Sequence, residues 1–468
     1  MVASFWNTDL VVAVIALFAI GAPLMGLSHY GCAKGVTMMS VSCRKAVVLL
    51  TCLLVVLSLL SSSCRMAADP NKPLDYSSDA RLAIAEIEAA HPVFLMDEVP
   101  EGYEEAKAEY LEAVSKDLLL NDFLLATQKY LAVLGDGHMG SGLPRKGQYI
   151  DVRWISIDER LYLLDNDGHV TDVEVIQIGG VPVEEVQRQI ETYYFAENDA
   201  ARQRQYEVYC RQDDMLRLAG CEYGETIKVV TRDGSGAENT QECRFISSDL
   251  YSMYYDLYPS YIVEHRMIGD VFYVDLRTFR LSKEVTNTAN AIKDAIAKGC
   301  TKFIIDIRGN SGGNSAVGDE LLAAMGMRPP GYGVYICHSA LSQKLRKYTA
   351  SDRVTYFEPN LSAAVRNDDI HLVVLTDRKT FSSATMLGVW VQDGKLGTIV
   401  GQPSSNSPSC YGDMLSVRLP ISNVNLQISY KKFLRPDENT DQDTLHTDIL
   451  TGFDEDALEV ALEYLAGK

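Results

Sequence analysis

The sequence predicts a mixed α/β protein with three parts: a helical unit, a β-rich module and an α/β sheet domain. From residue 270 onward, apolar runs such as 271–276, 302–307 and 332–337 alternate with helical segments, which is typical of a sheet buried on both faces. Upstream, residues 148–250 contain short alternating runs broken by Asn, Asp and Gly turns, which indicates strands, and one amphipathic helix is expected at 183–194. Residues 79–134 instead show near-helical spacing of apolar side chains.

Composition excludes several classes of protein. The chain of 468 residues is 47% hydrophobic and 23% charged, which is ordinary for globular proteins and unlike disordered or collagen-like chains. Its formal net charge of −20 argues against a general nucleic-acid binder, because phosphate backbones need Lys and Arg. The 10 Cys include no C-x-x-C pair, so we expect no structural zinc site.

The amino-terminal segment predicts export. An apolar stretch at 46–60 follows Arg44 and Lys45 and precedes Ser-Ser-Ser-Cys64, which resembles a lipoprotein signal peptide with Cys64 as the lipid anchor. We therefore expect a bacterial lipoprotein, anchored at the periplasmic face or the cell surface. A second apolar stretch at 10–27 leaves open a two-span membrane anchor.

The boundaries expected from these patterns divide the whole chain. They are 1–37, an over-extended start or extra hydrophobic segment; 38–64, the signal peptide; 65–78, a tether; 79–147, the helical domain; 148–250, the β-rich module; and 251–468, the sheet domain.

A glycine-rich segment follows the helical unit. Gly135-Asp-Gly-His-Met-Gly140 fits G-x-G-x-x-G, but a dinucleotide site needs a strand before the motif and a helix after it. Here a helical stretch precedes the motif, so cofactor binding is not expected. The segment is either a helix-ending glycine turn or a turn that presents His138.

A second glycine-rich segment follows a buried strand. Gly309-Asn-Ser-Gly-Gly313 fits G-x-S-x-G between a strand and a helix, which makes Ser311 a candidate nucleophile of an α/β-hydrolase esterase. That arrangement would need Asp369 or Asp377 together with His446. Alternatively, the glycine N–H groups of this loop bind a developing oxyanion.

Ser382 lies at another predicted strand-to-helix junction, in Thr-Phe-Ser-Ser-Ala. A serine at such a junction is either a helix cap or a nucleophile, and this segment alone favours the cap.

Taken together, the segments LGDGHMG, FIIDIRGNSGGN, TDRKTFSSAT, IVGQPSSNSPSCYGD, LPIS and FLRPD form an ordered series. The series resembles carboxy-terminal-processing (tail-specific) proteases and the tricorn protease core, from about residue 79 to the end. The most specific element is DxRxNxGG. The resemblance implies a PDZ-like module at 148–250, a crotonase-like catalytic domain at 251–468, and a serine endopeptidase acting on peptides or proteins without a cofactor or metal.

The same resemblance suggests individual roles. It places the nucleophile at Ser382, with Ser383 as the fallback, and the oxyanion donors at Gly312, Gly313 and Ser383. Processing-type members have a lysine where this chain has Ser407, so the tricorn-like variant with His138 as base is favoured. The tricorn motif has Ser in place of Gly137.

Tricorn-like members carry a glutamate shortly before a Pro-Asp pair near the end of the chain. Here its place as third catalytic residue is expected to be taken by Asp441, with Asp443 as the alternative. Because the expected lysine and glutamate are missing, a second reading is an inactive relative that binds peptides as a lipoprotein. The esterase based on Ser311 is a third reading.

Overall fold

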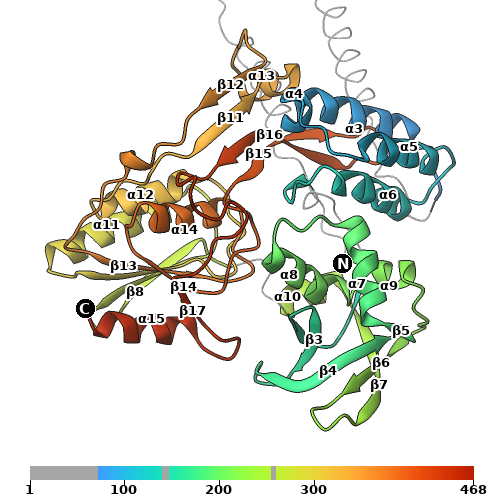
Figure 1. The fold of residues 1–468 in the computed structure, drawn as a ribbon, viewed down its shortest axis with the longest axis horizontal. Helices are drawn as coiled ribbons and strands as arrows, with labels where there is room; N and C mark the ends of the chain where they lie inside the picture. The colour runs from blue at the N-terminus through green and yellow to red at the C-terminus, as the bar shows by residue number, and fades with distance from the viewer. Residues whose placement is uncertain (1–71, 140–146, 255–259) are drawn as a thin grey trace, which may run out of the picture. The chain divides into compact units, whose positions relative to one another are not determined.

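A computed structural model describes residues 72–139, 147–254 and 260–468, all of which lie in one compact unit (Figure 1). The expected signal peptide, Cys64 and most of the tether lie outside the described residues. Within the described ranges, no helix is long and apolar enough to cross a membrane.

The predicted helical unit is confirmed. Its helices are α3 (Ser77–Ala90), α4 (Pro92–Leu95), α5 (Tyr103–Ala113) and α6 (Leu120–Ala132). In α3 the buried Ala80, Ala83, Ile84 and Ile87 recur at helical spacing and form its core-facing stripe. His91 ends α3 and caps α4, because its Nδ1 accepts a hydrogen bond from the Val93 N–H.

The β-rich module contains an antiparallel sheet in the order β1-β7-β6-β4-β3-β2, with β5 paired to β4. Its strands are β1 (Gln148–Ile150), β2 (Trp154–Ile157), β3 (Arg160–Leu164), β4 (Val170–Ile178), β5 (Val181–Pro182), β6 (Thr226–Arg232) and β7 (Glu238–Ser247).

Helices accompany this sheet: α7 (Val183–Tyr193), α8 (Asp199–Tyr209), α9 (Asp213–Leu218) and α10 (Ser248–Tyr254). The sequence predicts only α7 among them. It misses α8 because buried Gln203 interrupts the apolar stripe, although the Asn198 side chain caps the helix.

The α/β sheet is confirmed and has the order β17-β14-β13-β10-β9-β8. All neighbouring strands are parallel except the β8–β9 pair. The strands are β8 (Val263–Ile268), β9 (Val271–Leu276), β10 (Lys302–Asp306), β13 (His371–Thr376), β14 (Thr398–Gly401) and β17 (Ile449–Leu450).

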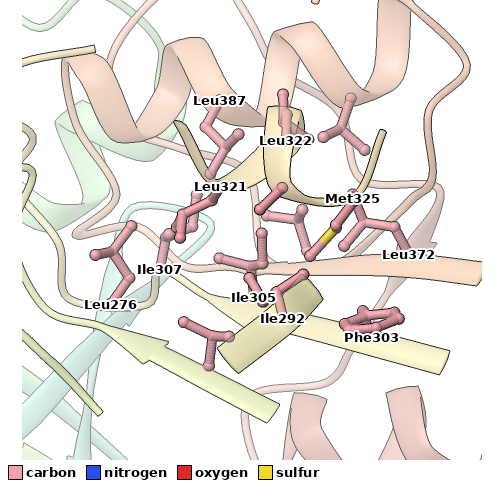
Figure 2. Close-up of a cluster of buried hydrophobic side chains, with 14 of the residues drawn as sticks. Leu276, Ile292, Phe303, Ile305, Ile307, Leu321, Leu322, Met325, Leu372 and Leu387 are labelled. Carbon is pink, nitrogen blue, oxygen red and sulfur yellow. The ribbon is translucent and has the colours of Figure 1, made fainter. Parts of the chain in front are cut away.

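Helices cover both faces of this sheet. They are α11 (Lys283–Ala297), α12 (Ala316–Ala324), α14 (Ser383–Asp393) and α15 (Ala457–Ala466). The first three share one apolar core with the sheet, around Phe303 and Ile305 (Figure 2), and α15 packs on the other face. Because β10 and β13 are parallel neighbours, the loops that follow them meet at one sheet edge.

One strand prediction is wrong in its placement. The run at 332–337 is expected in the α/β sheet, but β11 (Gly333–Cys337) belongs to a separate antiparallel sheet, β12-β11-β16-β15. Its middle residues are only partly buried, as suits a strand without helices on both sides. The other members are β12 (Val354–Phe357), β15 (Cys410–Arg418) and β16 (Asn425–Leu434), with α13 (Ala340–Arg346) and the short η2 (Leu361–Ala363) in the connections.

The second sheet joins the helical unit to the rest of the chain. Leu415, Leu426 and Ile428 of β15 and β16 share an apolar core with the helices α3, α5 and α6. This packing brings the turn after α6 into reach of the α/β sheet edge.

Candidate catalytic site

Ser382 lies at the β13–α14 junction and has an unusual backbone conformation. Its φ of 56° and ψ of −125° are rarely adopted by residues other than glycine, and such strain is typical of functional positions. It occupies the N-cap position of α14, yet its side chain caps nothing. Instead, Ser382 Oγ lies 3.0 Å from His138 Nε2, across 244 residues of sequence.

The backbone around Ser382 is held by its neighbours. The Ser382 N–H donates to Asn406 Oδ1 at 2.8 Å, and the Ser383 hydroxyl donates to the Gly313 carbonyl at 2.8 Å. Gly312 has a φ of +93°, and a Cβ on it would lie 2.8 Å from Ser382 Cβ and from Ser383 N. Only glycine fits this approach of the two loops.

His138 is presented by the glycine turn that follows α6, as one of the sequence readings expects. Gly135 turns the chain with a φ of +66°, and the His138 N–H donates to Asp136 Oδ1 at 2.8 Å. The imidazole packs against the Phe381 ring, with centroids 4.7 Å apart. The base-bearing turn therefore meets the serine-bearing loop directly.

Asp136 lies near Nδ1 of this imidazole, the ring nitrogen that does not face Ser382. Its Oδ1 lies 3.8 Å from His138 Nδ1, and its Oδ2 accepts a hydrogen bond from His91 Nε2 at 3.1 Å. His91 Nδ1 already accepts the Val93 N–H, so the proton of a neutral His91 resides on Nε2. Burial raises the pKa of Asp136, but the hydrogen bond from His91 and the neighbouring His138 hold that pKa below its ordinary value.

Glu197 is a second carboxylate at the site, and sequence reasoning missed it. It comes from the segment between α7 and α8 of the β-rich module. Its Oε1 accepts the Gly137 N–H, and its Oε2 accepts from the Ser407 N–H and the Asn406 side chain. Burial raises the pKa of Glu197, and the opposing effects of His138 and the Ser407 N–H are smaller.

This carboxylate also explains Gly137, where the resemblance expects a serine. A Cβ at Gly137 would lie 2.7 Å from Glu197 Oε1, so the carboxylate takes the place of a side chain there. No local pattern around residue 197 signals this contact, because the partner segments are 60 and about 210 residues away along the chain.

Asp136, His138 and Glu197 lie close enough together to ligate a metal ion. Their carboxylate oxygens, however, already accept hydrogen bonds from His91, from the backbone of residues 137, 138 and 407, and from Asn406. The arrangement therefore fits carboxylates that face an imidazole better than a metal site.

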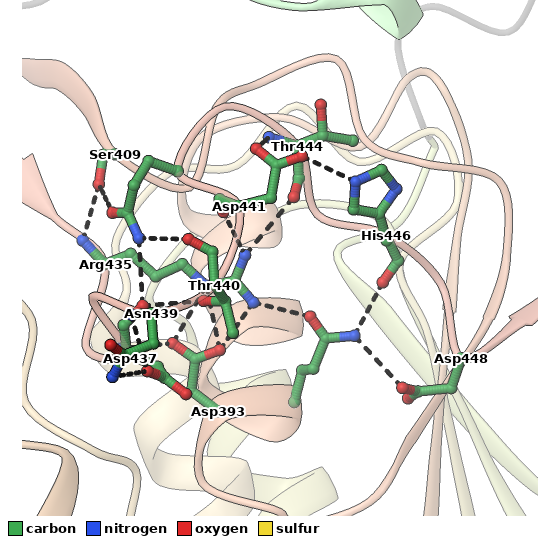
Figure 3. Close-up of polar contacts among 12 residues, drawn as sticks. Asp393, Ser409, Arg435, Asp437, Asn439, Thr440, Asp441, Thr444, His446 and Asp448 are labelled. Atoms are coloured by element: carbon green, nitrogen blue, oxygen red, sulfur yellow. Dashed lines mark hydrogen bonds and ion pairs between the residues drawn. The ribbon is translucent and has the colours of Figure 1, made fainter.

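The structure does not bring Asp441 or Asp443 to His138. Asp441 Oδ2 accepts a hydrogen bond from the exposed His446 at 2.8 Å, and its Oδ1 accepts from the Asp443 and Thr444 N–H groups (Figure 3). The Asp443 carbonyl accepts from the Asn198 side chain. This loop instead surrounds a buried Arg435–Asp393 ion pair, with Nη2 and Oδ1 2.7 Å apart.

The esterase arrangement is not assembled either. Ser311 is exposed on its loop, and within the described ranges no hydrogen bond joins it to a histidine. His446 pairs with Asp441, and Asp377 Oδ1 accepts the Gly309 and Lys379 N–H groups.

The polar residues of the DxRxNxGG motif hold the loop at residues 306–313 in place through hydrogen bonds and an ion pair. Asp306 pairs with Arg308, with Oδ2 and Nη2 2.7 Å apart. Asn310 donates from its side chain to the Leu276 carbonyl, accepts the Gly312 N–H at 2.8 Å, and accepts the Phe381 N–H on its backbone carbonyl. This places the loop beside Ser382 but commits the Gly312 N–H, which is therefore a poor oxyanion donor.

Two predicted oxyanion donors remain. Ser383 is the first residue of α14, where a backbone N–H has no partner within the helix. Gly313 is exposed, and no hydrogen bond from its N–H is found in the described part of the chain. Both residues line the cavity that contains Ser382 and His138.

This cavity has a volume of about 530 Å³. Met386 and Trp390 follow Ser382 at helical spacing along α14, and with Tyr332 and Phe433 they form an apolar wall. Arg346 and Lys431 also line the cavity. It can hold a short stretch of peptide next to the Ser382–His138 pair.

Comparison with solved structures shows proteins of similar fold. The fold is similar to mature CPAF complexed with lactacystin, with a TM-score of 0.58, 12% identity, and coverage of 84% of this chain and 97% of that chain. It is also similar to a serine-to-alanine mutant of CPAF, with a TM-score of 0.56, 13% identity, and coverage of 84% and 96%. No curated protein sequence matches the chain. Residues 270–449 of this chain match the model of peptidase family S41.

Proposed function

We propose that the protein is a serine endopeptidase in which Ser382 attacks the peptide carbonyl and His138 is the general base. The observation that carries this proposal is the 3.0 Å contact between Ser382 Oγ and His138 Nε2 inside a cavity. A serine hydroxyl needs an adjacent base within hydrogen-bond reach, and this pair meets that requirement. The S41 match supports the reaction class.

In this mechanism the proton of Ser382 Oγ moves to His138 Nε2 as Oγ bonds to the peptide carbonyl carbon. His138 then gives that proton to the leaving amine as the C–N bond breaks, and an acyl-serine remains. Water attacks the acyl-serine, His138 takes a proton from the water, and the proton returns to Ser382 when the acid product leaves. The Ser383 and Gly313 N–H groups stabilise the negative oxygen in both steps.

Asp136 is the residue we propose to orient the base. For Nε2 to accept a proton, the neutral imidazole must carry its hydrogen on Nδ1, and Asp136 Oδ1 is the carboxylate oxygen 3.8 Å from that atom. At 3.8 Å this contact is longer than a hydrogen bond, and catalytic contacts often tighten when substrate binds. His91 keeps the carboxylate ionised and fixed in place.

Glu197 has a different role in this proposal. Through Gly137, Asn406 and Ser407 it ties the base-bearing turn to the loop that holds the Ser382 N–H.

A lysine base at position 407 is excluded, because this residue is Ser407. Lys431, which also lines the cavity, is held by Asp413 with Nζ and Oδ2 2.7 Å apart.

The direct test is labelling with a fluorophosphonate, which reacts with activated serines. We expect a single covalent adduct on Ser382 of the purified protein, identified by mass spectrometry after digestion, and no adduct in His138→Ala. An adduct on Ser311 would favour the esterase. A folded protein without any adduct would favour an inactive relative that binds peptides.

The family resemblance extends the proposal to the rest of the chain. We propose that residues 148–250 act as a PDZ-like module, that 251–468 adopt a crotonase-like catalytic fold, and that the protein is an exported lipoprotein anchored through Cys64. The mass of the mature protein checks the last point: it should begin at a lipid-modified Cys64, and Cys64→Ala should retain the uncleaved amino terminus. A mature protein that begins elsewhere contradicts the anchor.

A further inference from the structure

Two cationic side chains line the cavity that holds Ser382. Arg346 is the last residue of α13, and Lys431 lies on β16. The chain as a whole carries a formal net charge of −20, so a cationic wall beside the reacting hydroxyl runs against its general charge. Charge of this kind inside a cavity concentrates and orients ligands of the opposite sign.

The strand register fixes how near Lys431 lies to the base. Lys431 on β16 is paired with Gly412 on β15, and a Cβ on Gly412 would lie 3.7 Å from His138 Nε2. Directly opposed residues of an antiparallel pair have their Cβ atoms roughly 5 Å apart. Since an extended peptide advances about 3.3 Å per residue, Lys431 can reach a substrate group about one to three residues from the bond that is cut.

Asp413 holds both cations at this position. Lys431 Nζ lies 2.7 Å from Asp413 Oδ2, Arg346 Nη2 pairs with Asp413 Oδ1, and the Tyr430 hydroxyl donates to Oδ2 at 3.0 Å. In a regular strand Asp413 would face away from Gly412 and Lys431, but its φ of 56° is left-handed and brings it into the cavity wall. Two cations against one carboxylate leave a net positive charge at the wall.

We infer that Arg346 and Lys431 form a subsite for a carboxylate of the peptide substrate. The carboxylate is an Asp or Glu side chain of the peptide. This inference rests on the proposed peptidase function, and it adds the class of substrate: a peptide with a negative charge within a few residues of the cleaved bond. The ligand carboxylate makes charge-assisted hydrogen bonds with the two cations while Asp413 keeps them in place.

The test measures binding in a Ser382→Ala background, so that it does not depend on turnover. A short-peptide library is selected on the immobilised protein, and one enriched peptide is compared with its Glu→Gln form by fluorescence anisotropy. We expect the acidic form to bind about tenfold more tightly, as a hydrogen bond to a charged group allows. Lys431→Met should remove most of this difference, and Lys431→Glu should reverse it in favour of Lys-containing peptides.

Lys432→Met is the matched control. Lys432 is the next residue on the same strand and pairs with Glu98, with Nζ and Oε2 2.7 Å apart, and it does not line the cavity. It should leave the Glu/Gln ratio unchanged. All peptides are amidated at the carboxyl end, so that the Glu side chain is the carboxylate being compared.

A Glu/Gln ratio that is near one, or that survives both Lys431→Met and Arg346→Leu, overturns the subsite. Failure of the peptidase proposal is seen separately, as absence of the fluorophosphonate adduct on Ser382 of the wild-type protein. The binding ratio is still measured in that case, so the two failures are distinguishable.

Discussion

Ser382→Ala is expected to lower kcat/KM for peptide cleavage by about 10⁶-fold, with His138→Ala causing a similar loss. The two side chains share one hydrogen bond and act as a unit, so neither is useful without the other. The double variant should therefore be no worse than either single variant. Steady-state cleavage of a fluorogenic peptide measures all three, and circular dichroism checks that each variant is folded.

Ser311→Ala is the matched control for this prediction. It removes the hydroxyl of the rival G-x-S-x-G motif from an exposed loop position. Activity should be retained in Ser311→Ala. Loss of activity there, with activity kept in Ser382→Ala, would reverse the assignment of the nucleophile.

Asp136→Asn is expected to lower kcat by about 10⁴-fold with little change in KM. An amide no longer favours the imidazole tautomer with hydrogen on Nδ1, and it does not stabilise the imidazolium that forms during attack. Glu197→Gln is the comparison, because it neutralises the other nearby carboxylate. It should cost less, since Glu197 acts through backbone and amide contacts. A larger loss in Glu197→Gln would make Glu197 the orienting acid.

The pH dependence of His91 variants checks the same assignment. Burial raises the pKa of Asp136 and His91 lowers it, so removing His91 raises that pKa. Because Asp136 has a lowered pKa in the folded protein, its carboxylate contributes stability above pH 3.8, and this is lost as pH falls through the lowered value.

His91→Phe should therefore move the lower end of the acid limb of the stability profile, which is the unfolding free energy measured by urea denaturation at a series of pH values, to higher pH. His91→Gln keeps an N–H near the Nε2 position and should shift the limb less. Equal profiles for both variants would indicate that His91 only fills space.

Long apolar runs made the sheet domain predictable. Strand β10, for example, has an apolar centre because both faces are buried there, and that pattern is visible without knowledge of distant partners. The partly buried β11 was assigned to the wrong sheet, because a short apolar run does not reveal which strand it pairs with. Helix α8 was missed because it buries polar as well as apolar side chains.

The site was partly predictable for a similar reason. The two turns that carry His138 and Ser382 have recognisable local patterns: glycines after a helix for His138, and serines after a strand for Ser382. The structure brings the two turns together. The order of residues in related chains points to Asp441 as the acid, whereas Asp136 lies two residues before His138 in the same glycine-rich motif. Glu197 has no local signature, because its partners come from distant loops.

The residues of the proposed site come from three different parts of the chain, and this has a consequence for recombinant fragments. The hydroxyl belongs to the stretch 270–449, whereas the imidazole, Asp136 and His91 come from the amino-terminal helices, and Glu197 comes from the module between them. Under the proposed mechanism, a shortened protein cut to residues 270–449 would keep Ser382 but would lack the base His138. Any engineered or inherited exchange that preserves activity must move all three parts together.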